Sequence, residues 1–227
     1  SSDSQKSAGR RSLTTLSFCN EEISTHYNSL LSLMHTWGER VDQKLSRKIS
    51  DELMKKYYGE DMWWAADLED FELNPYQLYD GGIALLSYDS SNPEVTAKIA
   101  SLSKDLPANG LLSLFDNTAM KWYFYKTLDN IQVTSEDAAA SLWGLAALNE
   151  PVLIDIMNLL QSDDVNIGIK EKLYLGIGLA ELGRLDEAQK IYDDINDLYS
   201  VSNSPYVYID SKTTRDDTIE LTSLCSV

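Results

Sequence analysis

The sequence predicts an all-α protein built from antiparallel helical hairpins. Three observations support this fold class. Apolar residues recur every three or four positions through most of the chain, which is the spacing of amphipathic helices. Helix-capping patterns such as Asn92-Pro93-Glu94 separate these segments. The links between segments are short, and short links favour antiparallel neighbours. The 227 residues, 43% of them hydrophobic, are enough for a substantial core.

The clearest predicted element is a helical hairpin over residues 169–202. Its first helix ends at Gly183, where a left-handed residue is common after a helix. Asp186 and Glu187 begin the second helix at the positive end of its dipole. The second helix has a continuous apolar face, formed by Leu185, Ala188, Ile191, Tyr192, Ile195 and Leu198. We therefore expect two packed helices joined by a tight turn.

The same patterns predict the remaining elements in chain order. Gly81 and Gly82 are unusual inside a helix, and we interpret them as a kink or a close contact. Ser135 and Asp216 are the predicted N-caps of two helices. One short extended segment is predicted at Tyr206–Ile209. The other predicted helices are Phe18–Trp37, Glu39–Tyr58, Tyr76–Tyr88, a helix from Asn92 to Leu106, Leu111–Leu128, the helix from Ser135 to Leu148, and Pro151–Leu160.

Composition predicts three parts of unequal size. Residues 1–12 are small and polar and are predicted to be a flexible lead-in. Residues 13–60 form an N-terminal helical arm, and residues 61–227 form the main helical-hairpin domain. The boundary is the stretch Gly59–Asn74, which interrupts the helical periodicity. Because the last predicted helix has no C-terminal stop signal, we expect the main domain to be truncated and the chain to belong to a longer polypeptide.

The net charge of −17 limits the classes of partner. Residues 1–60 are nearly balanced, so the acidic excess lies in residues 61–227. Such a surface repels phosphate backbones and anionic lipids, which disfavours nucleic-acid binding and membrane adsorption. No apolar run reaches the length of a membrane-spanning helix, so membrane insertion is not expected.

The two cysteines, Cys19 and Cys225, lie near opposite ends of the chain. Two thiols are too few for a structural zinc site. Buried free thiols and a disulfide both remain open, because a disulfide requires the two ends to meet. Low cysteine content does not decide the compartment. An extracellular or cell-surface location is favoured over a cytoplasmic one.

One group of residues suggests a binding site. Aromatic rings stack on sugars, and paired carboxylates can cleave a glycosidic bond. The alternative is that the tryptophans fill the junction between arm and main domain while the acids stay in water. The candidate binding residues are Trp63, Trp64, Asp67, Asp70, Tyr76 and Tyr79.

Motifs for catalysis and cofactor binding are missing from the sequence. It contains no phosphate-binding loop, no dinucleotide-binding glycine pattern, no nucleophile elbow and no zinc-protease motif. His26 and His35 are nine positions apart, which places them on opposite sides of one helix. We therefore predict no metal site, no cofactor and no catalytic residue.

The hairpin at residues 169–202 resembles one tetratricopeptide unit. The resemblance depends on matching large, small, turn and aromatic positions at Leu175, Gly176, Leu179, Gly183, Ala188 and Tyr192. Lys172, Ile195 and Ser200 depart from that repeat. A family of peptide-binding adaptors uses such units, so this resemblance implies a peptide-binding role.

Residues 136–148 and 216–225 resemble the inner helices of an α/α toroid. Both segments begin with acidic residues and continue with helix-forming turns. This sequence pattern resembles that of the helices in the terpenoid-cyclase-like toroid, which also forms the thioester domain of α-macroglobulins. The thioester sequence of that family is absent, since Ser226 and Val227 follow Cys225. The resemblance implies either a toroid or an irregular solenoid without the catalytic motifs of the family.

The sequence leads to three hypotheses about function. The first is a non-catalytic helical interaction or structural module of a larger, exported bacterial surface protein, which binds another protein or another domain of its own chain. The second is a carbohydrate-active α/α toroid with an acidic, tryptophan-containing cleft. The third is a tetratricopeptide-type adaptor that binds peptides. The absence of catalytic motifs favours a protein that is not an enzyme, without deciding the question.

Overall fold

Helices dominate the computed structural model, which describes residues 21–59, 73–106, 114–162 and 167–226. Within these residues it contains nine α-helices, one 3-10 turn and a single two-stranded sheet. The prediction of a mostly helical protein is thus confirmed. In the described part of the chain, no helix combines the length and the apolar character needed to cross a membrane.

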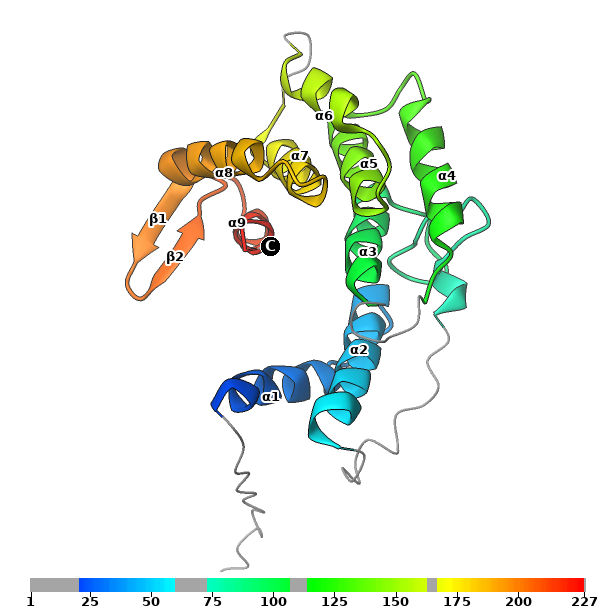
Figure 1. Cartoon of the computed structure of the whole chain (residues 1–227), viewed down its shortest axis with the longest axis vertical. Coiled ribbons are helices and arrows are strands. Elements are labelled where there is room, and N and C mark those ends of the chain that lie inside the picture. The colour runs from blue at the N-terminus through cyan, green and yellow to red at the C-terminus, as the bar shows by residue number, and fades with distance from the viewer. Residues whose placement is uncertain (1–20, 60–72, 107–113, 163–166, 227) are drawn as a thin grey trace, which may run out of the picture.

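The first two helices form an arm that joins the main core at one end. Helix α1 (Glu21–Met34) packs against α2 (Val41–Tyr58). The start of α2 belongs to the main core, because Val41 and Leu45 are buried there. The Val41 amide also donates a hydrogen bond to the Leu85 carbonyl at 2.9 Å. The far end of the arm extends away from the other helices (Figure 1).

The predicted helix at Tyr76–Tyr88 is wrong. The structure has a 3-10 turn at Asn74–Tyr76 and then a compact loop with two isolated β-bridges, one of them between Gln77 and Ile83. Gly81 adopts φ +88°, and a Cβ there would lie 2.1 Å from the Ala119 carbonyl oxygen. Only glycine fits both that dihedral angle and that approach. The loop therefore packs tightly against the helix that carries Ala119.

Helices α3 to α6 build the centre of the molecule. They are α3 (Pro93–Asp105), α4 (Asn117–Leu128), α5 (Ser135–Ala147) and α6 (Leu153–Leu160). Helix α5 is buried from Ala138 to Ala147 because α3, α4, α6 and α7 (Ile169–Glu181) all pack on it. Gly144 of α5 allows the Phe124 ring of α4 to approach so closely that a Cβ would lie 2.2 Å from it.

The predicted hairpin over residues 169–202 forms as two packed helices. Helix α7 spans Ile169–Glu181 and α8 spans Leu185–Tyr199. Gly183 between them has the left-handed angle φ +75°. The chain continues into an antiparallel hairpin of β1 (Ser200–Asn203) and β2 (Tyr206–Ile209), followed by α9 (Arg215–Leu224). Strand β1 was not predicted, and it pairs with the extended segment that was.

Several helices begin a few residues away from their predicted starts. Thr134 and Thr214, rather than Ser135 and Asp216, are the N-caps of α5 and α9, and each threonine hydroxyl accepts a bond from the amide three residues later. Helix α4 begins at Asn117, after the N-cap Asp116, and not at the predicted residue 111. Ser135 and Asp216 therefore lie inside the first turns of α5 and α9.

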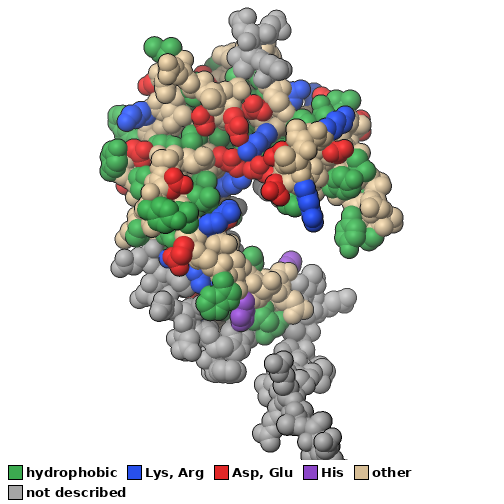
Figure 2. Space-filling model, turned by 180° about the vertical axis from the view of Figure 1, so that it is seen from behind, with side chains coloured by type: hydrophobic (Ala, Val, Ile, Leu, Met, Phe, Trp, Pro, Cys, Tyr) green, Lys and Arg blue, Asp and Glu red, His purple; other side chains and the backbone are tan. Residues whose placement is uncertain are grey.

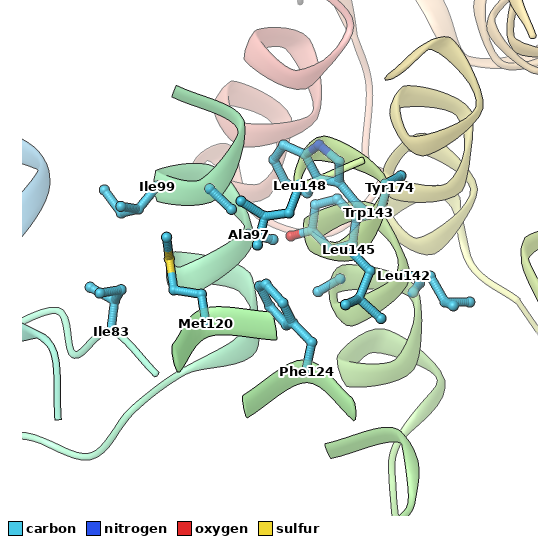
Figure 3. Close-up of a cluster of buried hydrophobic side chains, with 14 of the residues drawn as sticks. Ile83, Ala97, Ile99, Met120, Phe124, Leu142, Trp143, Leu145, Leu148 and Tyr174 are labelled. Carbon is cyan, nitrogen blue, oxygen red and sulfur yellow. The ribbon is translucent and has the colours of Figure 1, made fainter. Parts of the chain in front are cut away.

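The core is continuous from α2 through α9. Figure 3 shows Met120 and Phe124 of α4 within a cluster that includes Ala97 and Ile99 of α3 and Leu145 of α5. Trp143 of α5 stacks on Tyr174 of α7 with ring centroids 5.4 Å apart and an angle of 18° between the planes. This aromatic pair lies at the centre of the fold, behind the charged residues described next.

Candidate functional site

The first turns of three helices meet at one cluster of charged side chains. Glu94 of α3, Glu136 of α5 and Lys170 of α7 each lie within two residues of the start of their helix. Lys98, one turn after Glu94, and Glu220 of α9 complete the group. These five residues are called the ion-pair cluster below. Acidic side chains gather near the centre of one face of the molecule, with basic side chains beside them (Figure 2).

Lys170 is the hub of the ion-pair cluster. Its Nζ lies 3.0 Å from Glu94 Oε2, 2.8 Å from Glu136 Oε1 and 3.2 Å from Glu220 Oε2. Lys98 Nζ pairs with the other oxygen of Glu94 and lies 3.2 Å from Glu220 Oε1. The Glu94 and Glu220 carboxylates therefore each bridge two ammonium groups. Because the members come from α3, α5, α7 and α9, the cluster ties four helices together.

Burial and charge act on these groups in opposite directions. Burial opposes the ionisation of Glu94, but the Lys98 and Lys170 ammonium groups outweigh it and lower the pKa of Glu94 to about 2. Burial also disfavours the charged form of Lys170, yet Glu136 and Glu94 raise its pKa above the ordinary lysine value. Glu94 and Lys170 are therefore both charged at neutral pH.

Two aromatic side chains lie behind the ion-pair cluster. Lys170 Nζ lies 5.8 Å from the centroid of the Tyr174 ring, within the range of a cation–π contact. Burial raises the pKa of Tyr174, and the nearby Glu94 carboxylate raises it further. The Tyr174 hydroxyl and the Trp143 indole nitrogen are both buried without a hydrogen-bond partner among the described residues. The buried aromatic pair thus excludes water from the inner side of the ion-pair cluster and lowers the local dielectric constant there.

A cleft opens beside the ion-pair cluster, between the start of α2, α3 and α9. Its volume is about 570 Å³, within the range of ligand-binding cavities. We call it the α3–α9 cleft. Its apolar walls come from Val41, Leu85, Val95, Ile99, Leu102, Trp143 and Leu224. Its polar groups are Arg40, Asp42, Asn92, Glu94, Lys98, Ser101, Glu220 and Ser223.

The Glu94 carboxyl is unsuited to act as a general acid. A general acid must hold a proton near neutral pH, and the low pKa of Glu94 prevents this. Glu220, the other carboxylate of the cluster in the cleft, is paired with two lysines. Within the described residues, no group of three or more His, Cys, Asp or Glu side chains is arranged to hold a metal ion.

The predicted sugar-binding residues are only partly within the described ranges. Trp63, Trp64, Asp67 and Asp70 lie outside them, and their role stays a prediction. Tyr76 is 2% exposed, and its hydroxyl donates a hydrogen bond to the Glu39 carbonyl at 2.6 Å. Tyr79 is fully exposed in the loop before α3. Tyr76 therefore fixes the arm to the core, whereas Tyr79 faces solvent.

Cys225 is a half-buried free thiol at the end of α9. It lines a second groove of about 320 Å³, whose other residues come from α7, α8 and Leu224. Burial raises the pKa of this thiol, which makes it less reactive. The possible partner Cys19 lies outside the described residues.

Sequence reasoning missed the ion-pair cluster almost entirely. Glu94 and Lys98 are four positions apart on one helix, a spacing that predicts a local pair. Nothing in the sequence connects them with Glu136, Lys170 and Glu220, which lie far along the chain. The position of Lys170 in the first turn of a helix is a possible signal, because a cation is unfavourable at the positive end of the dipole unless carboxylates surround it.

No protein-family model, no curated protein and no solved structure matches this sequence.

Proposed function

We propose that this chain is a non-catalytic helical interaction module that binds another polypeptide in the α3–α9 cleft. The single observation that carries the proposal is the combination of the apolar walls of the cleft with the ion-pair cluster at its edge. The walls offer a place for a buried side chain, which is the usual anchor of a protein interface. The three carboxylates and two ammonium groups of the ion-pair cluster contact one another and so position the helices, and one negative charge remains in excess.

The partner is a segment with an apolar anchor residue next to a basic one. Leu102 lines the cleft with half of its surface exposed (50%), so it is available to an incoming apolar side chain. Glu94, Glu220 and Asp42 supply three carboxylates to the cleft, against two cations from Arg40 and Lys98. A chain with a net charge of −17 also attracts basic segments over distance.

The arrangement of the helices suits this role. The starts of α3, α5 and α7 meet at Lys170, and each of these helices is followed by a helix that packs against it, namely α4, α6 and α8. This order is compatible with an irregular solenoid or an α/α toroid of helical pairs, which we propose as the architecture. Such assemblies commonly present an extended surface formed by one helix of each pair.

A peptide-display experiment tests the proposal. A library of random linear peptides is selected on the intact chain, and each selected peptide is measured against variants. We expect peptides that combine Leu, Ile or Phe with Lys or Arg. Leu102→Lys removes the apolar surface of the cleft and repels the basic residue of the peptide, so it should weaken binding about tenfold or more. Leu198→Lys is the matched control, because Leu198 is 70% exposed on α8, away from the cleft.

Two results would overturn the proposal. In the first, the Leu198 variant loses binding as strongly as the Leu102 variant, or neither variant loses any. In the second, the purified chain hydrolyses a substrate in a panel of glycosidase, esterase and peptidase substrates, which contradicts a non-catalytic module.

A further inference from the structure

The outer face of α4 carries exposed aromatic rings that take no part in the core. Trp122 is 72% exposed and Tyr125 is 40% exposed. They are three positions apart on the helix, so their Cβ atoms are neighbours at roughly 5–6 Å. Met120, Tyr123 and Phe124 occupy the opposite, buried side of the same helix. Large exposed rings cost solvation free energy, which makes a pair of them a candidate binding surface.

The Tyr125 ring is held in place by a charged pair. Its hydroxyl donates a hydrogen bond to Glu150 Oε2 at 2.7 Å, and Lys121 Nζ lies 2.7 Å from Glu150 Oε1. Burial together with the Glu150 carboxylate raises the pKa of Tyr125 to about 12, so the hydroxyl remains a neutral donor. A ring that is already fixed loses little entropy when a ligand stacks on it.

The other exposed residues of this face are all capable of hydrogen bonding. From the N-cap to the C-cap of α4, no aliphatic side chain is among the exposed residues. The exposed residues are Asp116, Thr118, Trp122, Tyr125, Lys126 and Asp129. On α4 itself this face lacks the aliphatic side chains that normally fill the centre of a protein interface; the exposed Ile131 follows the helix, and the exposed Ile154 lies on α6. Aromatic rings among hydrogen-bonding groups instead match a sugar, whose C–H faces are apolar and whose edges carry hydroxyl groups.

We propose that this surface, formed by Thr118, Lys121, Trp122, Tyr125 and Glu150, binds a carbohydrate. A pyranose ring stacks on Trp122 and contacts the edge of Tyr125, and its hydroxyl groups bond to the outer lone pairs of Glu150 and to the Thr118 hydroxyl. The ligand is a neutral glycan, because the acidic chain repels sulfated and sialylated ones. The site is separate from the α3–α9 cleft, since α4 and α9 lie on opposite sides of α5 (Figure 1).

The test is a nuclear magnetic resonance titration of the intact, nitrogen-15-labelled chain with neutral oligosaccharides. The probes are cellohexaose, chitohexaose, xylohexaose and laminarihexaose. We expect at least one of them to shift the indole N–H signal of Trp122, which the Trp122→Ala spectrum identifies by its loss. Trp122→Ala should weaken binding about tenfold or more, as removal of an aromatic anchor usually does. Tyr125→Phe keeps the ring but loses the bond to Glu150, and should weaken binding less.

Trp37→Ala is the matched control, because Trp37 is another exposed indole (84%) that lies after α1 and not on α4. Binding of the sugar should be unchanged in this variant. The proposal is overturned if none of the four oligosaccharides moves the Trp122 signal. It is equally overturned if Trp122→Ala binds as tightly as the natural sequence, or if Trp37→Ala loses as much. A polypeptide that binds through Trp122 while the sugars do not would reassign this face to protein recognition.

Discussion

Replacement of Lys170 by methionine is the sharpest test of the ion-pair cluster. Methionine reproduces the unbranched stem of lysine as far as Cε, and lacks the ammonium group that contacts three carboxylates. Glu94 and Glu220 then face each other with only Lys98 between them. The variant therefore loses three attractions and gains a repulsion between two neighbouring carboxylates.

The loss of stability in Lys170→Met depends on how far the paired side chains are exposed to solvent. The Lys170 side chain is 26% exposed, and its partners Glu94 and Glu220 are similarly shielded, whereas Glu136 is about half exposed. Exposed ion pairs are worth about 0–1 kcal/mol, and breaking fully buried ones costs about 3–5 kcal/mol. We place Lys170→Met between these limits, at about 2–3 kcal/mol of unfolding free energy at neutral pH.

Urea unfolding followed by far-ultraviolet circular dichroism measures this loss. Lys126→Met is the control, because Lys126 is exposed on α4 outside the cluster and should change stability by less than about 0.5 kcal/mol. Adding Glu94→Gln to Lys170→Met should restore about 1 kcal/mol by removing one of the two facing carboxylates. The reasoning is refuted if Lys170→Met is no less stable than Lys126→Met. It is also refuted if Glu94→Gln destabilises the Lys170→Met variant as much as it destabilises the natural sequence.

Three further predictions concern the cluster and the packing around it. Glu94→Gln should destabilise the chain at neutral pH. Its difference from the natural sequence should shrink as the pH falls below about 4.5 and vanish only below about 2, because a carboxyl whose folded pKa is lowered contributes only while it is ionised. Acid unfolding curves measure this difference, and a constant difference would contradict the prediction. Gly144→Ala should lower the free energy of unfolding by about 1–3 kcal/mol, because the alanine Cβ meets the Phe124 ring and this outweighs the better helix propensity of alanine. Adding Phe124→Leu to this variant should recover part of the loss, as measured by thermal unfolding. Tyr76→Phe should cost about 1 kcal/mol in urea unfolding through loss of the bond to the Glu39 carbonyl, and an unchanged midpoint would show that this bond contributes nothing.

The sequence predicted the elements whose ends carry local signals. Helix α3 begins where Asn92 caps it and Pro93 occupies its first position, and the side chain of Asn92 accepts a bond from the Val95 amide. The hairpin of α7 and α8 was predicted because Gly183 supplies the left-handed turn between two amphipathic helices. In both cases a few neighbouring residues determine the conformation.

Elements that depend on distant contacts were not predicted. The segment after Tyr76 has helical periodicity, yet its conformation is set by Gly81 against the backbone of α4 and by Gln77, whose amide bonds to both backbone groups of Asp116. Strand β1 has a polar sequence without alternation, and it exists because β2 pairs with it. Tertiary contacts override local preference in both segments.

The candidate site was the least predictable feature for the same reason. Tyr76 was grouped with Tyr79 by proximity in sequence, but one is buried and the other is exposed. The charged residues that meet at Lys170 come from four helices spread over more than half of the chain. Charged residues are common on helix surfaces, so no single one of them stands out until the fold brings the group together.

The measurement that most directly tests binding in the α3–α9 cleft is a map of the contact surface. A selected peptide is titrated into the labelled chain, and the backbone amide signals that shift are assigned to residues. We predict that the largest shifts cluster at Val95, Lys98 and Leu102 of α3 and at Glu220 of α9, all of which line the cleft. Shifts concentrated instead on the outer faces of α4 or α8, with these four residues unmoved, would contradict the proposed function.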